Sequence, residues 1–392
     1  MFDLVSFYFQ HVTSGDWLDY LLAPHNYHRL VWFRLLLALD VQVFKGTGLP
    51  FVVVAVFCLT GGALLLAREA QRTSTAGLGL PAAALALMLI LSTANAAGVS
   101  VPANTPHIHT FLFAILAILL AEPGAQSDGA SLATRRAAAI GCAIAAAFSL
   151  AVGLVLWPVL AFMAWRGGKA DRRWLGAVLA VGATFTAVYV YGQISGGQGP
   201  SLSAQSLAKS VEYFFAYLGL PWVRAWPPGG LAIGVALFLL ALIPIARPPR
   251  TASRRSDQIA TGLILFTLGT ATLAAFGRTD ITPEVDIPIR YAILTAPLHT
   301  GLLLFTLPWL DRQSSQRKRL LQAGVVMGCS VLLVQQVLIG HVAAQAGART
   351  RETIAQFEQG RRTPAMMPTI HPNLARAEAV SREMRERGVY QR

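Results

Sequence analysis

The feature that most constrains this chain is a series of apolar runs, each about as long as a helix that crosses a lipid bilayer. A transmembrane helix needs about 20 predominantly apolar residues, within a range of roughly 17–25. The runs are 47–67, 78–96, 107–121, 137–165, 174–192, 229–246, 258–276, 288–310 and 321–343. A transmembrane β-barrel would instead show segments of about ten residues with alternating polarity. The runs therefore predict an all-α fold, a polytopic bundle of transmembrane helices.

The composition agrees with this class of protein and argues against nucleic acid as a partner. Of the 392 residues, 54% are hydrophobic and only 13% are charged, whereas a soluble domain has about 25% charged residues. The net charge is +13, but much of the excess lies in short loops between apolar runs, as the positive-inside rule predicts. No basic stretch alternates with aromatic residues in a way that would stack bases. We therefore expect membrane lipid around the chain and no nucleic acid.

Arginine and lysine alternate between the loops, and this alternation predicts the orientation. Loop 97–106 has neither residue, and loop 193–228 has only two. The basic loops are 68–77, 122–136, 166–173, 247–257 and 311–320. Because basic loops stay in the cytoplasm, we expect a multi-pass membrane protein with these loops inside. The chain then divides into an extracytoplasmic segment 1–46, a transmembrane domain 47–343 and an extracytoplasmic tail 344–392.

The run 137–165 is too long for one ordinary span. The alternation of charge holds only if this run enters and leaves on the cytoplasmic side, and the stretch from Ser149 to Gly153 favours a break in its middle. We predict two short helices, 137–149 and 153–165, which line a cavity, because a broken helix at membrane depth needs protein or water to satisfy its backbone. With this pair the bundle has about 9–10 membrane segments. The alternative is one long tilted helix, which would invert every later loop.

Residues 14–48 concentrate polar side chains in a chain that is otherwise poor in charge. Within the 19 residues 16–34 lie two acids, two histidines and two arginines, namely Asp16, Asp19, His25, His28, Arg29 and Arg34. The acids and the histidines are each spaced i, i+3, which puts each pair on one face if the segment is helical. A carboxylate here can act as a general base, and arginines suit bidentate phosphate binding. From Leu30 to Phe44 the pattern is amphipathic and predicts a helix in the membrane interface.

Two other interpretations of this segment stay open. In the first, it is a solvated interfacial loop whose charges face water and lipid headgroups. In the second, Asp16, His25 and His28 form an oxygen and nitrogen ligand set for a divalent ion, although no HExxH or other strong zinc signature is present. The sequence thus predicts no cofactor with certainty. A divalent metal ion is the cofactor that these side chains could bind.

A second polar segment lies between the runs 258–276 and 288–310. Arg278 belongs to it, and Arg290 and Tyr291 stand at the start of the next span. An ionisable residue there is costly unless it is paired or reaches the interface. We predict a phosphate clamp beside the bilayer surface, close to the first segment. The alternative is that Arg290 reaches the interface and pairs with Asp286.

Two further stretches are amphipathic. Leu207–Trp222 predicts another interfacial helix, which could also wall a groove for a lipid substrate. The tail has helical stretches around 344–359 and 373–388. We expect it to lie on the surface or to bind a protein partner.

Three stretches resemble bacterial polytopic proteins related to the C-type glycosyltransferases. APHNYHRLVWFRLLLALDVQVFKGTG (23–48) is similar to their first outer loop, FSLAVGLVLWP (148–158) to a Ser-Leu-x-x-Gly-Leu segment, and FGRTD followed by IRY (276–291) to a late Gly-Arg…Arg-Tyr element. The resemblance implies many transmembrane helices with interfacial helices on the outer face. It implies transfer of a sugar from a polyprenyl-phosphate carrier to a lipid or polysaccharide acceptor.

The resemblance also implies roles for particular residues. The catalytic aspartate of the first outer loop is carried over to Asp16, with Asp19 second, and Asp16 would accept a proton from the acceptor hydroxyl. The substrate-binding set is His25, His28, Arg29, Arg34, Arg278, Arg290 and Tyr291, whose arginines would neutralise the departing polyprenyl phosphate.

This chain departs from the family pattern in two ways. Its acids are Asp-x-x-Asp rather than adjacent, and it is short for such an enzyme. A non-catalytic structural subunit of a larger membrane complex is therefore the alternative function.

Overall fold

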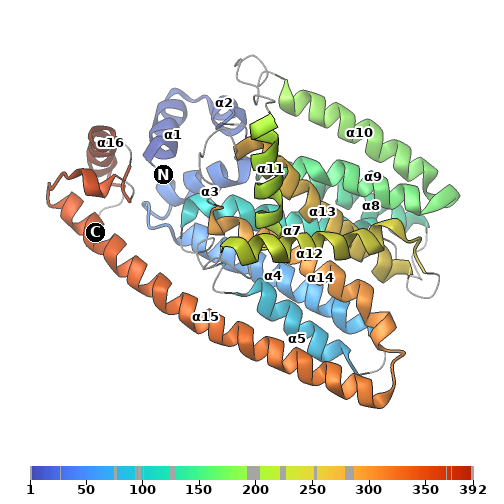
Figure 1. Cartoon of the computed structure of the whole chain (residues 1–392). Coiled ribbons are helices and arrows are strands. Elements are labelled where there is room, and N and C mark those ends of the chain that lie inside the picture. Colours follow the sequence, from blue (N-terminus) through green and yellow to red (C-terminus); the bar gives the residue numbers. More distant parts are fainter. Residues whose placement is uncertain are drawn as a thin grey trace.

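The computed structural model describes residues 2–26, 28–74, 77–92, 95, 99, 101–122, 129–191, 204–220, 227–250, 254–278, 287–367, 369–371 and 373–389. Every regular element within these residues is a helix (Figure 1), and a single β-bridge joins His25 and His28. The predicted all-α fold is therefore confirmed for the described part of the chain.

The helices follow the predicted apolar runs closely. The first three are α1 (Phe2–Ser14), α2 (Trp17–Leu22) and α3 (Val31–Gln42). The central ones are α4 (Leu49–Thr73), α5 (Gly79–Ile90), α7 (Thr105–Ala121), α8 (Gly129–Ala147), α9 (Leu156–Arg166), α10 (Arg172–Val190), α11 (Ala204–Leu218), α12 (Pro227–Ala246), α13 (Arg254–Arg278) and α14 (Ala292–Leu310). The last two are α15 (Ser315–Glu358) and α16 (Leu374–Glu386). Short 3-10 turns η2 (Pro102–Asn104), η3 (Ala151–Val155), η4 (Gly168–Asp171), η7 (Ile289–Tyr291) and η8 (Pro364–Met366) connect some of them.

Seven of the described helices are long and apolar enough to cross a membrane. They are α4, α7 with η2, α10, α12, α13, α14 and α15; α5 and the η3–α9 pair are shorter apolar helices. Because α5 ends at Ile90, the run predicted at 78–96 gives a helix shorter than a full span. The chain is thus a multi-pass helical bundle by length and composition.

The centre of the bundle differs from its edge in burial. In α7, α13 and α14, 67%, 67% and 61% of the most apolar stretch is buried, against 22%, 28% and 7% in α10, α12 and α15. The outer helices expose large apolar side chains such as Leu179, Leu239 and Val337. Exposure of such a surface to water is unfavourable in free energy, whereas contact with the hydrocarbon of a bilayer has no such cost.

The predicted break inside 137–165 is confirmed. Helix α8 ends at Ala147, η3 follows a short turn, and α9 begins at Leu156. Protein groups satisfy the backbone of the turn: the N–H of Val31 donates to the carbonyl of Phe148 at 2.9 Å, and the N–H of Ala151 donates to Nδ1 of His28 at 3.2 Å. A broken helix at membrane depth is tolerated on this condition.

Gly153 is the residue that lets the two short helices fold back on each other. A Cβ at this position would lie 2.3 Å from the carbonyl carbon of Ala146 and 2.4 Å from the nitrogen of Ala147, which are both backbone atoms. Gly153→Ala should therefore lower the free energy of unfolding in detergent by about 1–3 kcal/mol, the usual cost of overpacking. Gly141→Ala, on α8 with open space around the new methyl group, is the matched control. Equal thermal unfolding temperatures for the two variants would contradict this account.

The five loops predicted on one side lie together at one end of the bundle. Four contacts connect them: Ser74 to Asp311 at 2.7 Å, Glu69 to Arg255 at 3.1 Å, Asp171 to Arg136, and Asp171 to Arg254 at 3.9 Å. We call this the arginine-rich end. Burial raises the pKa of Glu122, which follows α7 at this end, to about 7.

The tail docks at the opposite end, where α1 lies. Helix α15 is continuous from Ser315 to Glu358, so no structural break marks residue 343. It runs along the side of the bundle beside α5, and α16 lies next to α1 (Figure 1). Asp3 of α1 pairs with Arg376 at 2.7 Å and His371 at 3.1 Å. Burial acts to raise the pKa of Asp3, but these two partners outweigh it and lower the pKa.

The two predicted interfacial segments form helices, and in α3 the charged side chains face inward. In α3, Arg34 and Asp40 are 2% and 0% exposed, whereas Leu35 and Leu39 are 41% and 42% exposed. Helix α11 packs against α12 and α13, with the ring of Tyr217 fully buried. Both amphipathic patterns therefore correspond to helices, and tertiary packing turned the charged side chains of α3 toward protein.

Candidate functional site

Asp16 lies in the turn between α1 and α2. Gly15 before it has φ +82°, a left-handed conformation that side chains other than glycine rarely adopt, so the turn depends on this glycine. Oδ1 of Asp16 accepts the backbone N–H of Asp19 at 3.3 Å and caps α2. The Asp16 side chain is exposed at the end of the bundle opposite the arginine-rich end.

Asp19 is engaged by a histidine that the sequence analysis did not single out. Nε2 of His11 lies 2.9 Å from Oδ2 of Asp19, and Nδ1 of His11 lies 3.0 Å from the carbonyl oxygen of Phe7. The pair joins α1 to α2 across the glycine turn. No local spacing could have revealed it, because the turn brings residues eight positions apart into contact. Of the two predicted acids, Asp16 makes no side-chain contact with a charged or titratable partner that is recorded for the described residues, whereas Asp19 contacts His11.

Arg34 is bound within the fold, and the substrate-binding role expected for it stays a prediction. Its guanidinium donates to the carbonyl oxygens of Ala23 at 2.6 Å and Leu21 at 3.2 Å, and lies over the rings of Phe7 and Tyr20. The hydroxyl of Tyr20 donates to the carbonyl of Arg34 at 2.9 Å. With 2% of its surface exposed, Arg34 holds α1, α2 and α3 together.

Arg29 also makes contacts within the fold, and its role in binding phosphate stays a prediction. Its backbone N–H donates to the hydroxyl of Tyr189 at 3.0 Å, and its guanidinium donates to the carbonyls of Tyr189, Tyr191 and Leu22. Because α10 ends at Val190, Arg29 fastens the first segment to the end of α10. Every acceptor it uses is a protein oxygen.

His25 and His28 form a tight turn rather than a helical face. Their backbones exchange two hydrogen bonds, at 2.7 and 3.0 Å, and Nδ1 of His28 accepts the N–H of Ala151. Burial lowers the pKa of His25. Within the described residues, no group of three His, Cys, Asp or Glu side chains could hold a metal ion, so the structure gives the alternative of a metal site at Asp16, His25 and His28 no support.

Arg290 and Tyr291 form the turn that precedes α14. Tyr291 is buried and its ring packs against those of His107 and Tyr217, with ring centroids 5.1 and 5.6 Å apart. Arg290 is half-buried, and its guanidinium lies 5.7 Å from the centroid of the Tyr291 ring. The side chain of Arg278, and Asp286 altogether, lie outside the described residues.

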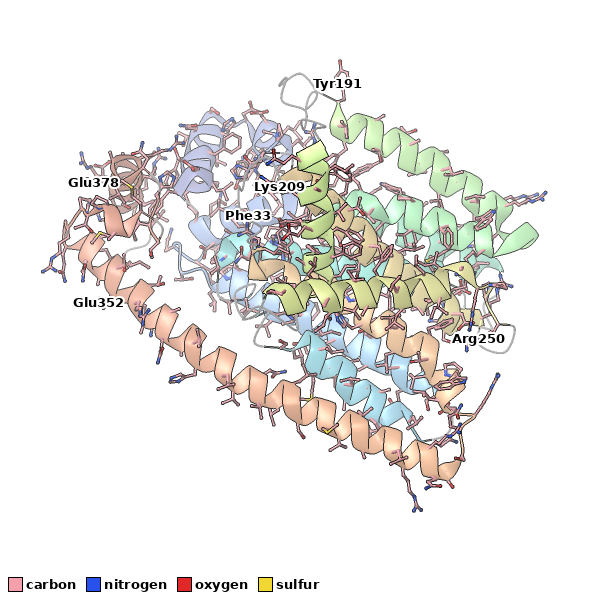
Figure 2. All side chains as sticks on the ribbon, in the orientation of Figure 1. Phe33, Tyr191, Lys209, Arg250, Glu352 and Glu378 are labelled. Carbon is pink, nitrogen blue, oxygen red and sulfur yellow. The ribbon has the colours of Figure 1, made fainter. Side chains whose placement is uncertain are left out.

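The predicted residues therefore share one end of the bundle. In Figure 2, Phe33 of α3 and Tyr191 lie toward this end and Arg250 toward the other. Asp16 presents the exposed carboxylate, Arg290 is the half-buried cation, and Arg29 and Arg34 fix the segment that carries Asp16. Chemically, this end can accept a proton and can neutralise an anion.

Comparison with family models, with curated proteins and with solved structures found no match for this chain.

Proposed function

We propose that this protein is a membrane glycosyltransferase, which moves a sugar from a polyprenyl-phosphate carrier to a hydroxyl of a lipid or polysaccharide acceptor. The observation that carries the proposal is the exposed carboxylate of Asp16, at the N-terminus of a short helix that two arginines hold rigidly. By the positive-inside rule, the arginine-rich end faces the cytoplasm of a bacterial inner membrane, and Asp16 faces the periplasm.

The reaction needs one base and one cation at the reacting groups. Asp16 accepts the proton of the acceptor hydroxyl, whose oxygen attacks the anomeric carbon of the sugar. The bond from that carbon to the phosphate oxygen breaks, and polyprenyl phosphate leaves with the electron pair. Arg290, together with Arg278, neutralises the charge that develops on the phosphate. Tyr291 positions Arg290 through the contact of its ring with the guanidinium.

The exposed side of α3 supports a location of this chemistry at the depth of the lipid headgroups. Trp32, Leu35 and Leu39 are exposed on the same helix whose Arg34 and Asp40 are buried. A helix with an apolar outer face, next to a segment of polar side chains, suits the membrane interface. A polyprenyl-phosphate donor has its phosphate at this depth and its chain in the bilayer, so it can enter from the membrane.

The test is turnover by the purified full chain with a labelled polyprenyl-phosphate sugar. We expect release of polyprenyl phosphate with this donor and no turnover with the corresponding nucleotide sugar. Arg290→Gln should raise the KM for the donor about tenfold to a hundredfold, because a hydrogen bond to a charged group contributes about 1.5–3 kcal/mol. Arg319→Gln, at an exposed position on α15, is the control. Equal turnover of the nucleotide sugar would contradict the proposed donor class.

A structural subunit of a membrane complex is the second candidate, and α15 favours it. Only 7% of the most apolar stretch of this helix is buried against the rest of the chain. At 1.5 Å per residue its 44 residues span about 66 Å, roughly twice the thickness of the hydrocarbon core. If the protein purifies in a fixed ratio with another membrane protein and shows no turnover with any polyprenyl-phosphate sugar, this second function is the correct one.

A further inference from the structure

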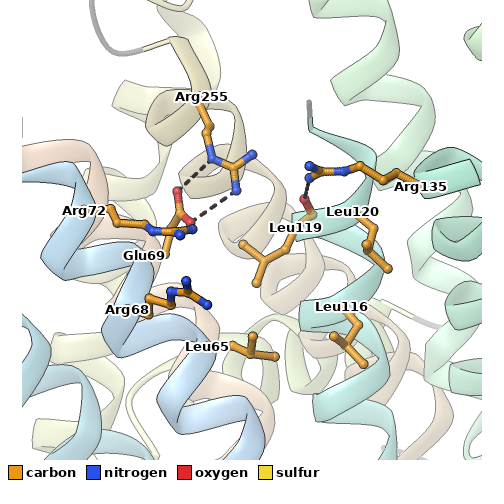
Figure 3. A pocket seen from close by; sticks show the side chains of 9 residues that line it. All are labelled: Leu65, Arg68, Glu69, Arg72, Leu116, Leu119, Leu120, Arg135 and Arg255. Atoms are coloured by element: carbon orange, nitrogen blue, oxygen red, sulfur yellow. Dashed lines mark hydrogen bonds and ion pairs between the residues drawn. The ribbon is translucent and has the colours of Figure 1, made fainter. Parts of the chain in front are cut away.

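A cavity of about 310 Å³ opens at the arginine-rich end, far from the proposed transfer site (Figure 3). It lies between the ends of α4 and α7, with α8 and α13 beside them. Its polar lining consists of Arg68, Arg72, Arg135, Arg255 and Glu69. Four cations therefore face one carboxylate, and the cavity has a formal excess of three positive charges.

The carboxylate of this cavity pairs with one of the four arginines. Nε and Nη2 of Arg255 donate to the two oxygens of Glu69 at 3.1 and 3.2 Å, and Nη1 of Arg255 donates to the carbonyl of Glu122 at 2.7 Å. Glu69 is 5% exposed. Because Glu69 carries one negative charge and pairs with Arg255, the other three arginines keep a net positive charge in the cavity.

The remaining arginines keep donors for a ligand. Arg135 uses Nη2 for the carbonyls of Leu119 and Glu122 at 3.2 and 3.0 Å, which are neutral acceptors. Arg68 and Arg72 are exposed and have no acceptor among the described residues. They lie four residues apart on α4, so both guanidinium groups stand on one face of that helix and reach toward the cavity in Figure 3.

The rest of the lining is apolar. Leu65 from α4 and Leu116, Leu119 and Leu120 from α7 form the wall beneath the arginines. Both helices are candidate membrane spans that end at this level, α4 at Thr73 and α7 at Ala121. A cationic rim above an apolar wall, at the depth where the spans end, matches an amphiphile with an anionic head.

We propose that this cavity binds the phosphate of an anionic membrane phospholipid. Arg68 and Arg72 hold the phosphate with bidentate donors, Arg255 and Arg135 add charge, and the leucines contact the first carbons of the acyl chains. The leucine wall distinguishes such a lipid from a free phosphate ion, which would gain nothing from it. This site is independent of the proposed sugar transfer, which takes place at the other end of the bundle.

The test uses native mass spectrometry on the full chain purified in a mild detergent. The wild type should retain phosphatidylglycerol in preference to phosphatidylcholine when both are supplied. Arg68→Gln/Arg72→Gln should lower the occupancy by phosphatidylglycerol about tenfold or more, since each arginine near a membrane surface contributes about 1 kcal/mol to the attraction of anionic lipid. Arg172→Gln/Arg173→Gln removes the same charge from exposed positions at the same end, outside the cavity, and should leave the occupancy unchanged.

A second measurement covers the apolar wall and the source of the phosphate. Leu120→Gln keeps every arginine and should reduce the rise in thermal unfolding temperature that phosphatidylglycerol produces. Inorganic phosphate at the same concentration should stabilise the wild type little. The proposal is overturned if the two arginine double variants lose lipid equally, if phosphatidylcholine is retained as well as phosphatidylglycerol, or if inorganic phosphate stabilises the protein as much as the lipid does.

Discussion

Asp16→Asn should lower kcat for sugar transfer by about 10²–10⁴-fold, the usual contribution of a positioned general base. The substitution removes the basic oxygen and changes little else. Asn is as good an N-cap as Asp, so the bond from the N–H of Asp19 persists, and the exposed side chain has no other partner among the described residues. The thermal unfolding temperature should therefore match that of the wild type. The measurement is single-turnover kinetics with a labelled polyprenyl-phosphate sugar.

Asp19→Asn is the matched control for this prediction. It alters the neighbouring acid on the same helix but breaks the contact with His11, so we expect a small loss of stability and a small loss of kcat. If Asp19→Asn abolishes transfer and Asp16→Asn does not, the base is Asp19. If neither substitution lowers kcat, the first segment holds no base and the mechanism is wrong.

Arg34→Ala should lower the free energy of unfolding by about 3–5 kcal/mol. Two half-buried carbonyl oxygens, those of Leu21 and Ala23, lose their donor, and each group left unsatisfied costs up to about 1–3 kcal/mol. The space between the rings of Phe7 and Tyr20 is left empty, which adds the cost of a cavity. Hydrogen exchange of α2 should increase in the same variant, because Arg34 joins α2 to α3.

Two further variants separate this structural role from a direct role in binding substrate. Arg34→Lys keeps the charge but lacks the planar fork that reaches two carbonyls, so it should restore only part of the stability. Arg319→Ala removes an exposed arginine and should change the free energy of unfolding by less than about 0.5 kcal/mol. A rise in KM for Arg34→Ala with unchanged unfolding would show that Arg34 contacts substrate after all.

Much of the architecture could be predicted from the sequence, because it depends on local properties. Burial in a bilayer requires about 20 apolar residues in a row, so the runs gave most helices to within a few residues. Charge in short loops fixed which loops lie together, and the contacts from Glu69 to Arg255 and from Ser74 to Asp311 agree. The two short helices within 137–165 could be predicted from the length of this run and from the basic residues in the loops.

The roles of individual residues could not be predicted as well. An arginine among apolar residues was expected to bind substrate phosphate, but in the structure Arg29 and Arg34 bind backbone carbonyls. Every residue has a carbonyl acceptor, so a sequence cannot show which of them an arginine will bind. The pairing of His11 with Asp19 depends on one left-handed glycine turn, which spacing does not reveal.

The sequence by itself determined that this chain is a multi-pass helical bundle, which loops gather at its arginine-rich end and where the run 137–165 breaks. Hydrophobicity, loop charge and length act along the chain, so they can be read in order. Only the tertiary structure decided which long polar side chains serve the fold and which remain available. The difference depends on the groups that packing brings within about 3 Å of each donor. Arg34 donates to a backbone carbonyl, whereas Arg68 has no acceptor among the described residues.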